Sequence, residues 1–199
     1  MIVLFSIAFF IKVIFAITGS LFELLPNSRF NNLSPFLLLF LSLIAAITEE
    51  YAFRGLFILK KRNIFLSFSI LSYYIFNSFV FKTSNFDTSN HFILRIALSL
   101  LSGGFFLYLY SIKENIFLSF WKKHFPFIFY TSSLIFAFAH LKNYHDLNWA
   151  LPVFIILPKF ISALLLGYIR VRYGLIYSIA LHSINNATPF LFLILSQKI

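Results

Sequence analysis

The sequence predicts an all-α protein, a polytopic membrane bundle of about seven transmembrane helices. Its 199 residues are 60% hydrophobic and only 11% charged, with a mean hydropathy of +0.90, which is too apolar for a water-exposed surface. The sequence contains several apolar stretches that are each about twenty residues long, which is the length a helix needs to cross the hydrocarbon layer. Basic residues gather in alternate connections between these stretches, as they do in membrane proteins.

The first expected span, residues 2–25, has neither the basic start nor the small-residue cleavage site of a signal peptide. We therefore interpret it as the first transmembrane helix rather than as a cleaved signal peptide. Six further apolar stretches follow it. The seven expected spans are residues 2–25, 35–59, 64–81, 92–112, 126–141, 151–169 and 175–195. No repeat or linker divides them.

Prolines mark several expected helix boundaries. Pro158 lies inside the sixth span instead, and should kink it. Residues 116–121, ahead of the short fifth span, are either an interfacial segment or an extension of the same helix. In the fourth span, Gly103 and Gly104 would let a neighbouring helix approach closely. The boundary prolines are Pro26, Pro35, Pro126 and Pro152.

The basic residues set the expected orientation. The connections after the second, fourth and sixth spans carry eight Lys and Arg, against four on the opposite side. The positive-inside rule then places the N-terminus and these connections in the cytoplasm and the C-terminus outside. The eight residues are Lys60, Lys61, Arg62, Lys113, Lys122, Lys123, Arg170 and Arg172.

Composition also narrows the function. The net charge of +10 is explained by these flanking residues, so no nucleic-acid partner is expected. With no cysteine, a catalyst must use carboxylate, imidazole, amide or hydroxyl groups. The excess of Phe, Ile and Asn suits a bacterium with an AT-rich genome, which makes the bacterial inner (plasma) membrane the expected location.

Glu49 and Glu50 stand side by side inside the second span. A charged side chain at the bilayer centre costs about 2.5–3.5 kcal/mol on the insertion scale, so such residues usually mark a functional site. Arg54 lies four residues after Glu50, on the same helix face, and the two can pair. Glu49 points about 100° away and is available as a general base. The alternative is a structural ion-pair cluster that ties helices together.

Two other polar groups occur in apolar helices. Phe136 and His140 lie four apart at the end of the fifth span, and His182 and Asn186 lie four apart in the last. Taken alone, His140 fits a packed or helix-end histidine, and the second pair fits hydrogen bonding between helices. Counted at 1.5 Å per residue from the cytoplasmic helix ends, however, Glu49 lies roughly 15 Å deep, His182 11 Å, Asn186 17 Å and His140 21 Å. All four side chains can therefore meet in one layer.

These motifs, Glu-Glu-x-x-x-Arg, Phe-x-x-x-His and His-x-x-x-Asn in that order, resemble the CPBP (CAAX protease and bacteriocin-processing, or Abi) family of intramembrane proteases, which includes the type II CAAX prenyl proteases. The stretch 167–174 resembles the glycine- and arginine-containing approach to the family's third motif. The similar core covers residues 46–187, with 1–45 holding the first span and the start of the second, and 188–199 the end of the last. Glu49 and His140 are 91 positions apart, further than in the family, so residues 64–112 are interpreted as an extra helical pair.

The resemblance implies an intramembrane endopeptidase that cleaves a membrane-associated or C-terminally prenylated substrate. Glu49 with His140 would activate water, His182 and Asn186 would stabilise the oxyanion, and Glu50 with Arg54 would hold the helix. The family is commonly described as metalloproteases. Zn²⁺ on Glu49, His140 and His182 and a metal-free mechanism driven by Glu49 both fit these residues.

Two other functions stay open. A catalytically idle relative would act as an immunity or binding protein. A proton-coupled transporter also uses intramembrane carboxylates and histidines, although no inverted repeat supports it. The expected partners are the lipid bilayer and a membrane-associated peptide or protein.

Overall fold

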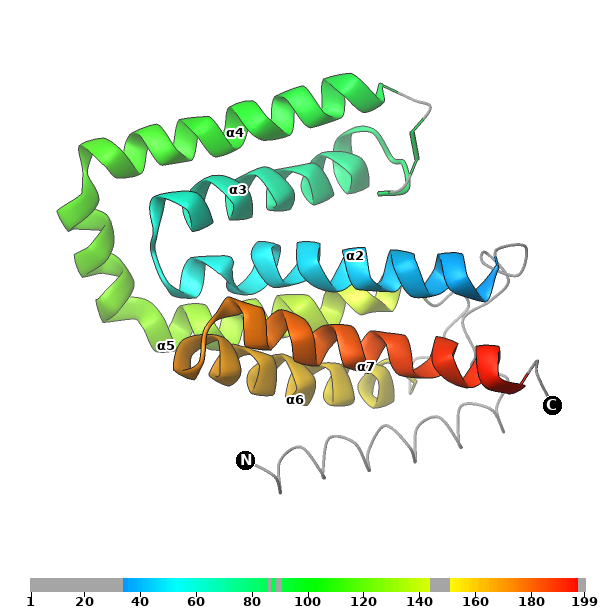
Figure 1. Cartoon of the computed structure of the whole chain (residues 1–199). Coiled ribbons are helices and arrows are strands. Elements are labelled where there is room, and N and C mark those ends of the chain that lie inside the picture. The colour runs from blue at the N-terminus through cyan, green and yellow to red at the C-terminus, as the bar shows by residue number, and fades with distance from the viewer. Residues whose placement is uncertain (1–33, 86, 89–90, 144–150, 197–199) are drawn as a thin grey trace. The chain divides into compact units, whose positions relative to one another are not determined.

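The computed structural model describes residues 34–85, 87–88, 91–143 and 151–196. These residues are almost all helical and contain no strand, which confirms the all-α class (Figure 1). They form two compact units. The first combines the described residues of Met1–Ile44 and Ile128–Ile199, and the second is Ala45–Phe127. The first expected span, 2–25, lies outside the described residues.

Three helical segments in the described part of the chain are long and apolar enough to cross a membrane. They are Phe36–Phe57, Lys61–Val80 and Phe92–Ile112. They coincide with the second, third and fourth expected spans. Helices also occupy the fifth, sixth and seventh, whereas seven membrane crossings stay a prediction.

Helix α2 covers Pro35–Arg54 and continues into a 3-10 turn, η1, at Gly55–Phe57. Pro35 suits the first helical position because the missing N–H would have no partner there. The Ser34 hydroxyl accepts a hydrogen bond from the Leu37 N–H at 3.2 Å and caps the first turn. The carboxylate motif is thus carried on the last two turns of a capped helix.

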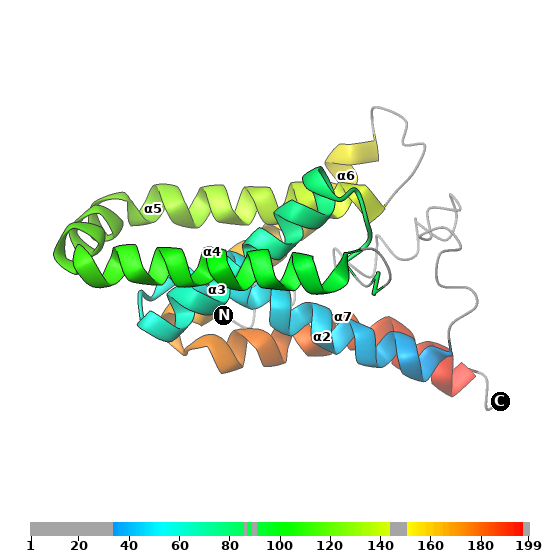
Figure 2. The same ribbon diagram turned by 90° about the horizontal axis from the view of Figure 1, so that it is seen from above.

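Helix α3 (Lys61–Ile75), its π-helical end η2 (Phe76–Val80) and helix α4 (Phe92–Ile112) pack against each other over the stretch interpreted as the extra pair (Figures 1 and 2). That this pair is an addition to the family core stays a prediction. A Cβ on Gly103 would lie 2.0 Å from the Ser69 hydroxyl and 2.6 Å from the Phe65 carbonyl oxygen. The predicted close approach is therefore confirmed for Gly103. It is wrong for Gly104, where a Cβ would meet nothing described within 4 Å.

Buried Arg95 ties the far end of this pair to the segment that joins its helices. Its guanidinium donates to the Asn77 side-chain oxygen at 3.1 Å and the Thr83 hydroxyl at 2.7 Å, and also to the Asp87 carbonyl. Such partners offset the cost of a cation within an apolar pair. The connection is thereby held to the first turn of α4.

Helix α5 covers Glu114–Ala139 and is followed by a 3-10 turn, η3, at His140–Asn143. The expected boundary at Pro126 is wrong, because this residue lies inside the helix. The helix continues through this proline, although an interior proline lacks an N–H and its ring crowds the carbonyl four residues earlier. Residues 116–121 are thus an extension of the fifth helix, and Lys122 and Lys123 lie in the helix rather than in a connection.

Helices α6 (Leu151–Arg172) and α7 (Leu175–Ser196) form an antiparallel hairpin (Figures 1 and 2). Pro158 lies within α6, as expected. Gly174 has a φ of +110°, a conformation that suits glycine, and its N–H donates to the Ile169 and Arg170 carbonyls at 3.2 Å each. This turn reverses the chain directly into the helix that carries His182.

Candidate active site

The carboxylate motif contains the predicted ion pair. Arg54 Nη1 lies 2.6 Å from Glu50 Oε1, and both side chains are fully buried, at 1% and 0% exposure. The four-residue spacing brings them together within a single helix. Glu49, on another side of α2, is only partly buried. The two neighbouring carboxylates therefore occupy different environments.

Helix α3 of the extra pair packs against this motif. The Tyr74 hydroxyl donates to the Thr48 hydroxyl at 2.6 Å, next to Glu49 in the chain, and Thr48 donates in turn to the Ala45 carbonyl at 3.1 Å. A Cβ on Gly55 would lie 2.1 Å from the Ser67 hydroxyl, so the two segments are in close contact. The extra pair thus positions the carboxylate helix.

His140 has a defined hydrogen bond at the end of α5. Its Nδ1 lies 2.8 Å from the carbonyl oxygen of Phe136. A carbonyl can only accept, so Nδ1 carries the hydrogen, and in the neutral ring Nε2 keeps its lone pair. The side chain is partly buried. Nε2 is therefore the ring atom suited to accept a proton.

The Phe136 ring brings the two histidine motifs together. Its centroid lies 4.5 Å from that of His140 and 5.8 Å from that of His182, the latter edge-on at 72°. Phe136 and His182 are both buried, at 2% and 3% exposure. The first residue of the second motif is thus the packing surface for both imidazoles.

One face of α7 carries Ser178, His182 and Asn186, each four residues from the next. The buried Ser178 hydroxyl donates to the Leu166 carbonyl of α6 at 3.1 Å. This bond fixes the rotation of α7 one turn before His182. Asn186 lies one turn after it, partly buried. The sequence interpretation missed Ser178, although its spacing from His182 is a signal that could have indicated it.

The candidate residues divide between the two units. Glu49, Glu50 and Arg54 belong to Ala45–Phe127, and His140, His182 and Asn186 to the other unit. Among the described residues of either unit, no three His, Asp or Glu side chains gather as a metal site would require. The hydrogen bond from His140 Nδ1 to a carbonyl is of a kind also made by metal-ligating histidines.

A family model, Type II CAAX prenyl endopeptidase Rce1-like, matches residues 113–188. The matched segment contains His140, His182 and Asn186, together with the Phe136 ring that contacts both imidazoles. The resemblance to the CPBP family is confirmed. The CAAX match begins just after the extra helical pair, so the carboxylate motif, on the other side of that pair, lies outside it. No curated protein and no solved structure matches the chain. The apolar helices and this family together identify an integral membrane protein related to proteases.

Proposed function

We propose that this chain is an intramembrane endopeptidase that hydrolyses a peptide bond in a membrane-associated or C-terminally prenylated substrate. One observation carries the proposal. His140 and His182 pack on the same Phe136 ring, inside the segment that resembles CAAX endopeptidases. A histidine pair arranged by sequence-distant helices, with one ring nitrogen assigned as acceptor, suits acid–base chemistry.

The nucleophile is water, activated by Glu49 with His140. Glu49 removes a proton as the water oxygen attacks the scissile carbonyl carbon, and His140 Nε2 accepts a hydrogen bond from the same water. The tetrahedral intermediate then collapses, the C–N bond breaks and the proton passes to the leaving amine. The products are a carboxylate and an amine, and no covalent enzyme intermediate forms.

His182 and Asn186 stabilise the negative charge that develops on the carbonyl oxygen. Both lie on one face of α7, whose rotation is fixed by Ser178. Fixed donors of this kind contribute about 2.7–4 kcal/mol each to lowering the barrier. The Glu50–Arg54 pair holds the helix and sets the electrostatic environment of Glu49.

Hydrolysis assisted by a zinc ion is an alternative mechanism for the same residues. Glu49, His140 and His182 would be the ligands, and zinc bound there would lower the pKa of its water to about 7. The roles of Asn186 and of the Glu50–Arg54 pair would stay the same.

The proposal is tested by quantitative terminal-peptide mass spectrometry on membranes from a null strain. The strain is complemented with wild type, Glu49→Gln or His182→Ala at matched protein levels. We expect new termini only with wild type, and their sequences identify the substrate. Identical termini in all three strains would exclude proteolysis and favour an idle immunity or binding protein. In that case, proton flux lost with Glu49→Gln would point to a transporter instead.

A further inference from the structure

Helix α3 contacts the chain at two points, one directly before the Glu-Glu-x-x-x-Arg motif and one directly after it. Thr48, the residue before the motif, accepts a hydrogen bond from the Tyr74 hydroxyl at 2.6 Å. Gly55, the residue after the motif, packs so closely on α3 that an added Cβ would lie 2.1 Å from the Ser67 hydroxyl. The whole motif therefore lies between two contacts with the same helix.

The two contacts are in register. Thr48 and Gly55 are seven residues apart, as are Ser67 and Tyr74, and the chain runs in opposite directions along the two segments (Figure 1). Seven residues make about two helical turns, so both contacts use one face of each segment. Because the interval is the same on both sides, the contacts limit the rotation of the motif as well as its distance from α3.

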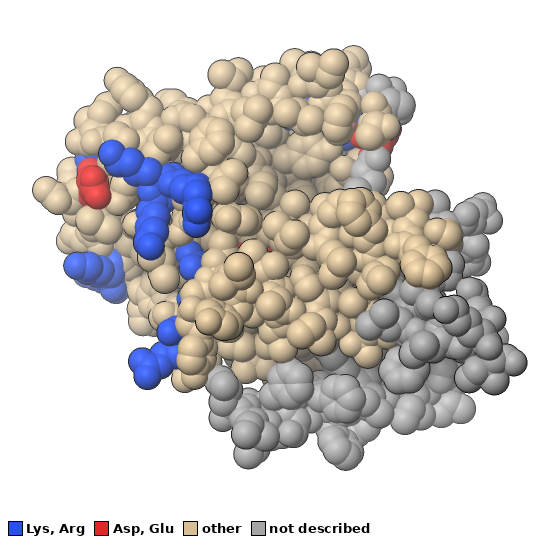
Figure 3. Space-filling model, in the orientation of Figure 1, with Lys and Arg blue, Asp and Glu red and all other residues tan. Residues whose placement is uncertain are grey.

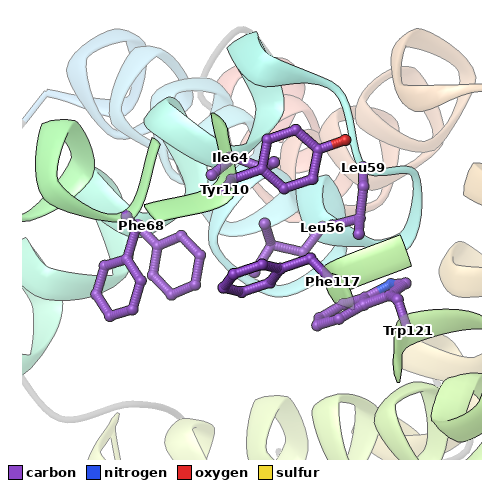
Figure 4. A pocket seen from close by; sticks show the side chains of 8 residues that line it. Leu56, Leu59, Ile64, Phe68, Tyr110, Phe117 and Trp121 are labelled. Atoms are coloured by element: carbon purple, nitrogen blue, oxygen red, sulfur yellow. The ribbon is translucent and has the colours of Figure 1, made fainter. Parts of the chain in front are cut away.

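The contact after the motif is part of an apolar end of the unit. Residues 60–62 connect this end to α3, and basic side chains gather on the surface here (Figure 3). Below that surface, Leu56 and Leu59 line a small apolar cavity together with Ile64 and Phe68 of α3 (Figure 4). Apolar packing therefore holds this end of the motif.

The contact before the motif is polar and lies two turns deeper in the expected span. The Thr48 hydroxyl donates to the Ala45 carbonyl at 3.1 Å, so towards Tyr74 it can only accept. These two bonds connect α3 to the backbone of the turn that precedes Glu49. The Glu49 carboxylate is also near enough to interact electrostatically with the Tyr74 hydroxyl. Tyr74 is partly buried.

We propose that Tyr74 is a positioning residue for Glu49. The inference rests on the proposed function, in which Glu49 activates water. Tyr74 acts through Thr48, which holds the turn from which Glu49 projects, rather than on the substrate itself. A displacement of about 1 Å at a catalytic group can cost about 10²-fold in rate. A helix that lies outside the family match thus contributes to the reaction.

The first test compares Tyr74 with its neighbour. Tyr74→Phe removes only a hydroxyl, and Tyr73→Phe is the matched control, because the Tyr73 hydroxyl donates to the Asn85 carbonyl at 2.9 Å instead. The probe is a fluorogenic peptide that spans the cleavage site found by terminal-peptide mass spectrometry. We expect Tyr74→Phe to lower kcat about tenfold with KM unchanged, because Glu49 is displaced while the substrate still binds. Tyr73→Phe should turn over like wild type.

Variants of Thr48 test the route of the effect. Thr48→Val removes the acceptor and should lower kcat as much as Tyr74→Phe does, and the double variant should fall no further than either single variant. Thr48→Ser keeps the hydroxyl and should retain turnover. Circular dichroism in detergent checks that each variant is folded. A double variant whose loss equals the product of the two single losses would overturn the route through Thr48.

Thiol labelling tests the position of residue 49 without any turnover. The chain has no cysteine, so Glu49→Cys introduces a single thiol. Its rate of modification by a water-soluble methanethiosulfonate is measured in the full-length protein, alone and combined with Tyr74→Phe or Tyr73→Phe. Thiol reactivity depends on exposure, so we expect Tyr74→Phe to change this rate by about threefold or more. Tyr73→Phe should leave it unchanged.

Two results would overturn the proposal. Wild-type kcat together with unchanged labelling in the Tyr74→Phe background would mean that the hydroxyl does not position Glu49. A raised KM with kcat unchanged would mean that Tyr74 contributes to substrate binding instead. If the wild-type chain cleaves no peptide, the proposed function fails, and the labelling rates still decide whether Tyr74 positions residue 49.

Discussion

The two units hold their polar residues in different ways. In Ala45–Phe127, opposite charges pair within one helix, between Glu50 and Arg54, and both are fully buried. In the other unit, the imidazoles of His140 in η3 and His182 in α7 pack against the aromatic ring of Phe136. The first arrangement follows from a spacing of four residues within one helix, whereas the second depends on the packing of separate helices.

This difference suits the two groups of residues to different roles, the ion pair to stabilising the fold and the histidines to the proposed reaction. A buried ion pair with short-range geometry is well suited to hold a helix, and its charges are already committed to each other. His140 instead donates its Nδ1 hydrogen to a carbonyl, which leaves Nε2 as the acceptor atom of the neutral ring. We therefore expect substitutions in the first pair to reduce the amount of folded protein, and substitutions of the histidines to reduce activity.

Breaking the ion pair should have the largest effect. Arg54→Ala removes the cation 2.6 Å from a buried carboxylate, and we expect a loss of about 3–5 kcal/mol in the free energy of unfolding. The measurement is thermal unfolding of the purified protein in detergent, together with its level in the membrane.

A double variant distinguishes pairing from packing. Glu50→Leu with Arg54→Met removes both charges while keeping apolar bulk, and it should recover most of the lost stability. If the double variant is as unstable as Arg54→Ala, the ion pair is not the stabilising element and the comparison fails for this unit.

The next effect concerns His140. His140→Asn keeps an amide N–H that can donate to the Phe136 carbonyl, but it offers nothing at the position of Nε2. We expect turnover to fall by about 10²-fold with little change in stability, because general-base assistance is lost. Cleavage of the substrate identified by terminal-peptide mass spectrometry provides the assay.

His140→Gln is the matched control, since its amide reaches the Nε2 position instead. It should retain more activity than the asparagine variant. A fully active asparagine variant would show that His140 acts only through its structural bond to Phe136.

A smaller effect should follow from separating the extra pair. Gly103→Ala places a Cβ 2.6 Å from a backbone carbonyl oxygen of α3, so the helices must move apart. Overpacking of this kind costs about 1–3 kcal/mol. Gly104→Ala, with nothing described within 4 Å of its Cβ, should unfold like wild type. Equal unfolding temperatures for the two variants would contradict the close approach at Gly103.

The features that could be predicted from the sequence are those set by local spacing. The Glu50–Arg54 pair follows from the helix repeat, and α4 begins and ends at the expected residues because apolar length defines it. The boundary at Pro126 was wrong, whereas the alternative that residues 116–121 extend the fifth helix is confirmed, because α5 continues through the proline despite the hydrogen bond that it removes. Helix depth predicted one layer for Glu49, His140, His182 and Asn186, which stays a prediction, and it did not indicate that His140 and His182 would both pack against the Phe136 ring.

Contacts between helices were harder to predict. Tyr74 and Ser178 are ordinary residues in apolar helices, and only packing shows that each hydroxyl donates a hydrogen bond to another segment. Arg95 likewise finds its partners in a connection whose path the sequence does not specify. Hydroxyl groups have no periodicity of their own, so their partners follow from the fold rather than the reverse.

The smallest expected effect is the most informative about the difference between the two units. It tests whether the unit that contains His140 and His182 depends on the rotation of α7. Ser178→Ala removes the hydrogen bond to the Leu166 carbonyl, and polar contacts between membrane helices contribute about 0.6 kcal/mol on average. Stability should therefore change little. Ser178 nevertheless fixes α7 one turn before His182, so turnover should fall by more than this energy implies, while Ser178→Thr, which keeps the hydroxyl, should restore it. A fall in turnover no larger than the loss of stability would mean that ring packing on Phe136 alone orients His182. The unit that contains His182 would then resemble Ala45–Phe127, because each would depend on one local contact.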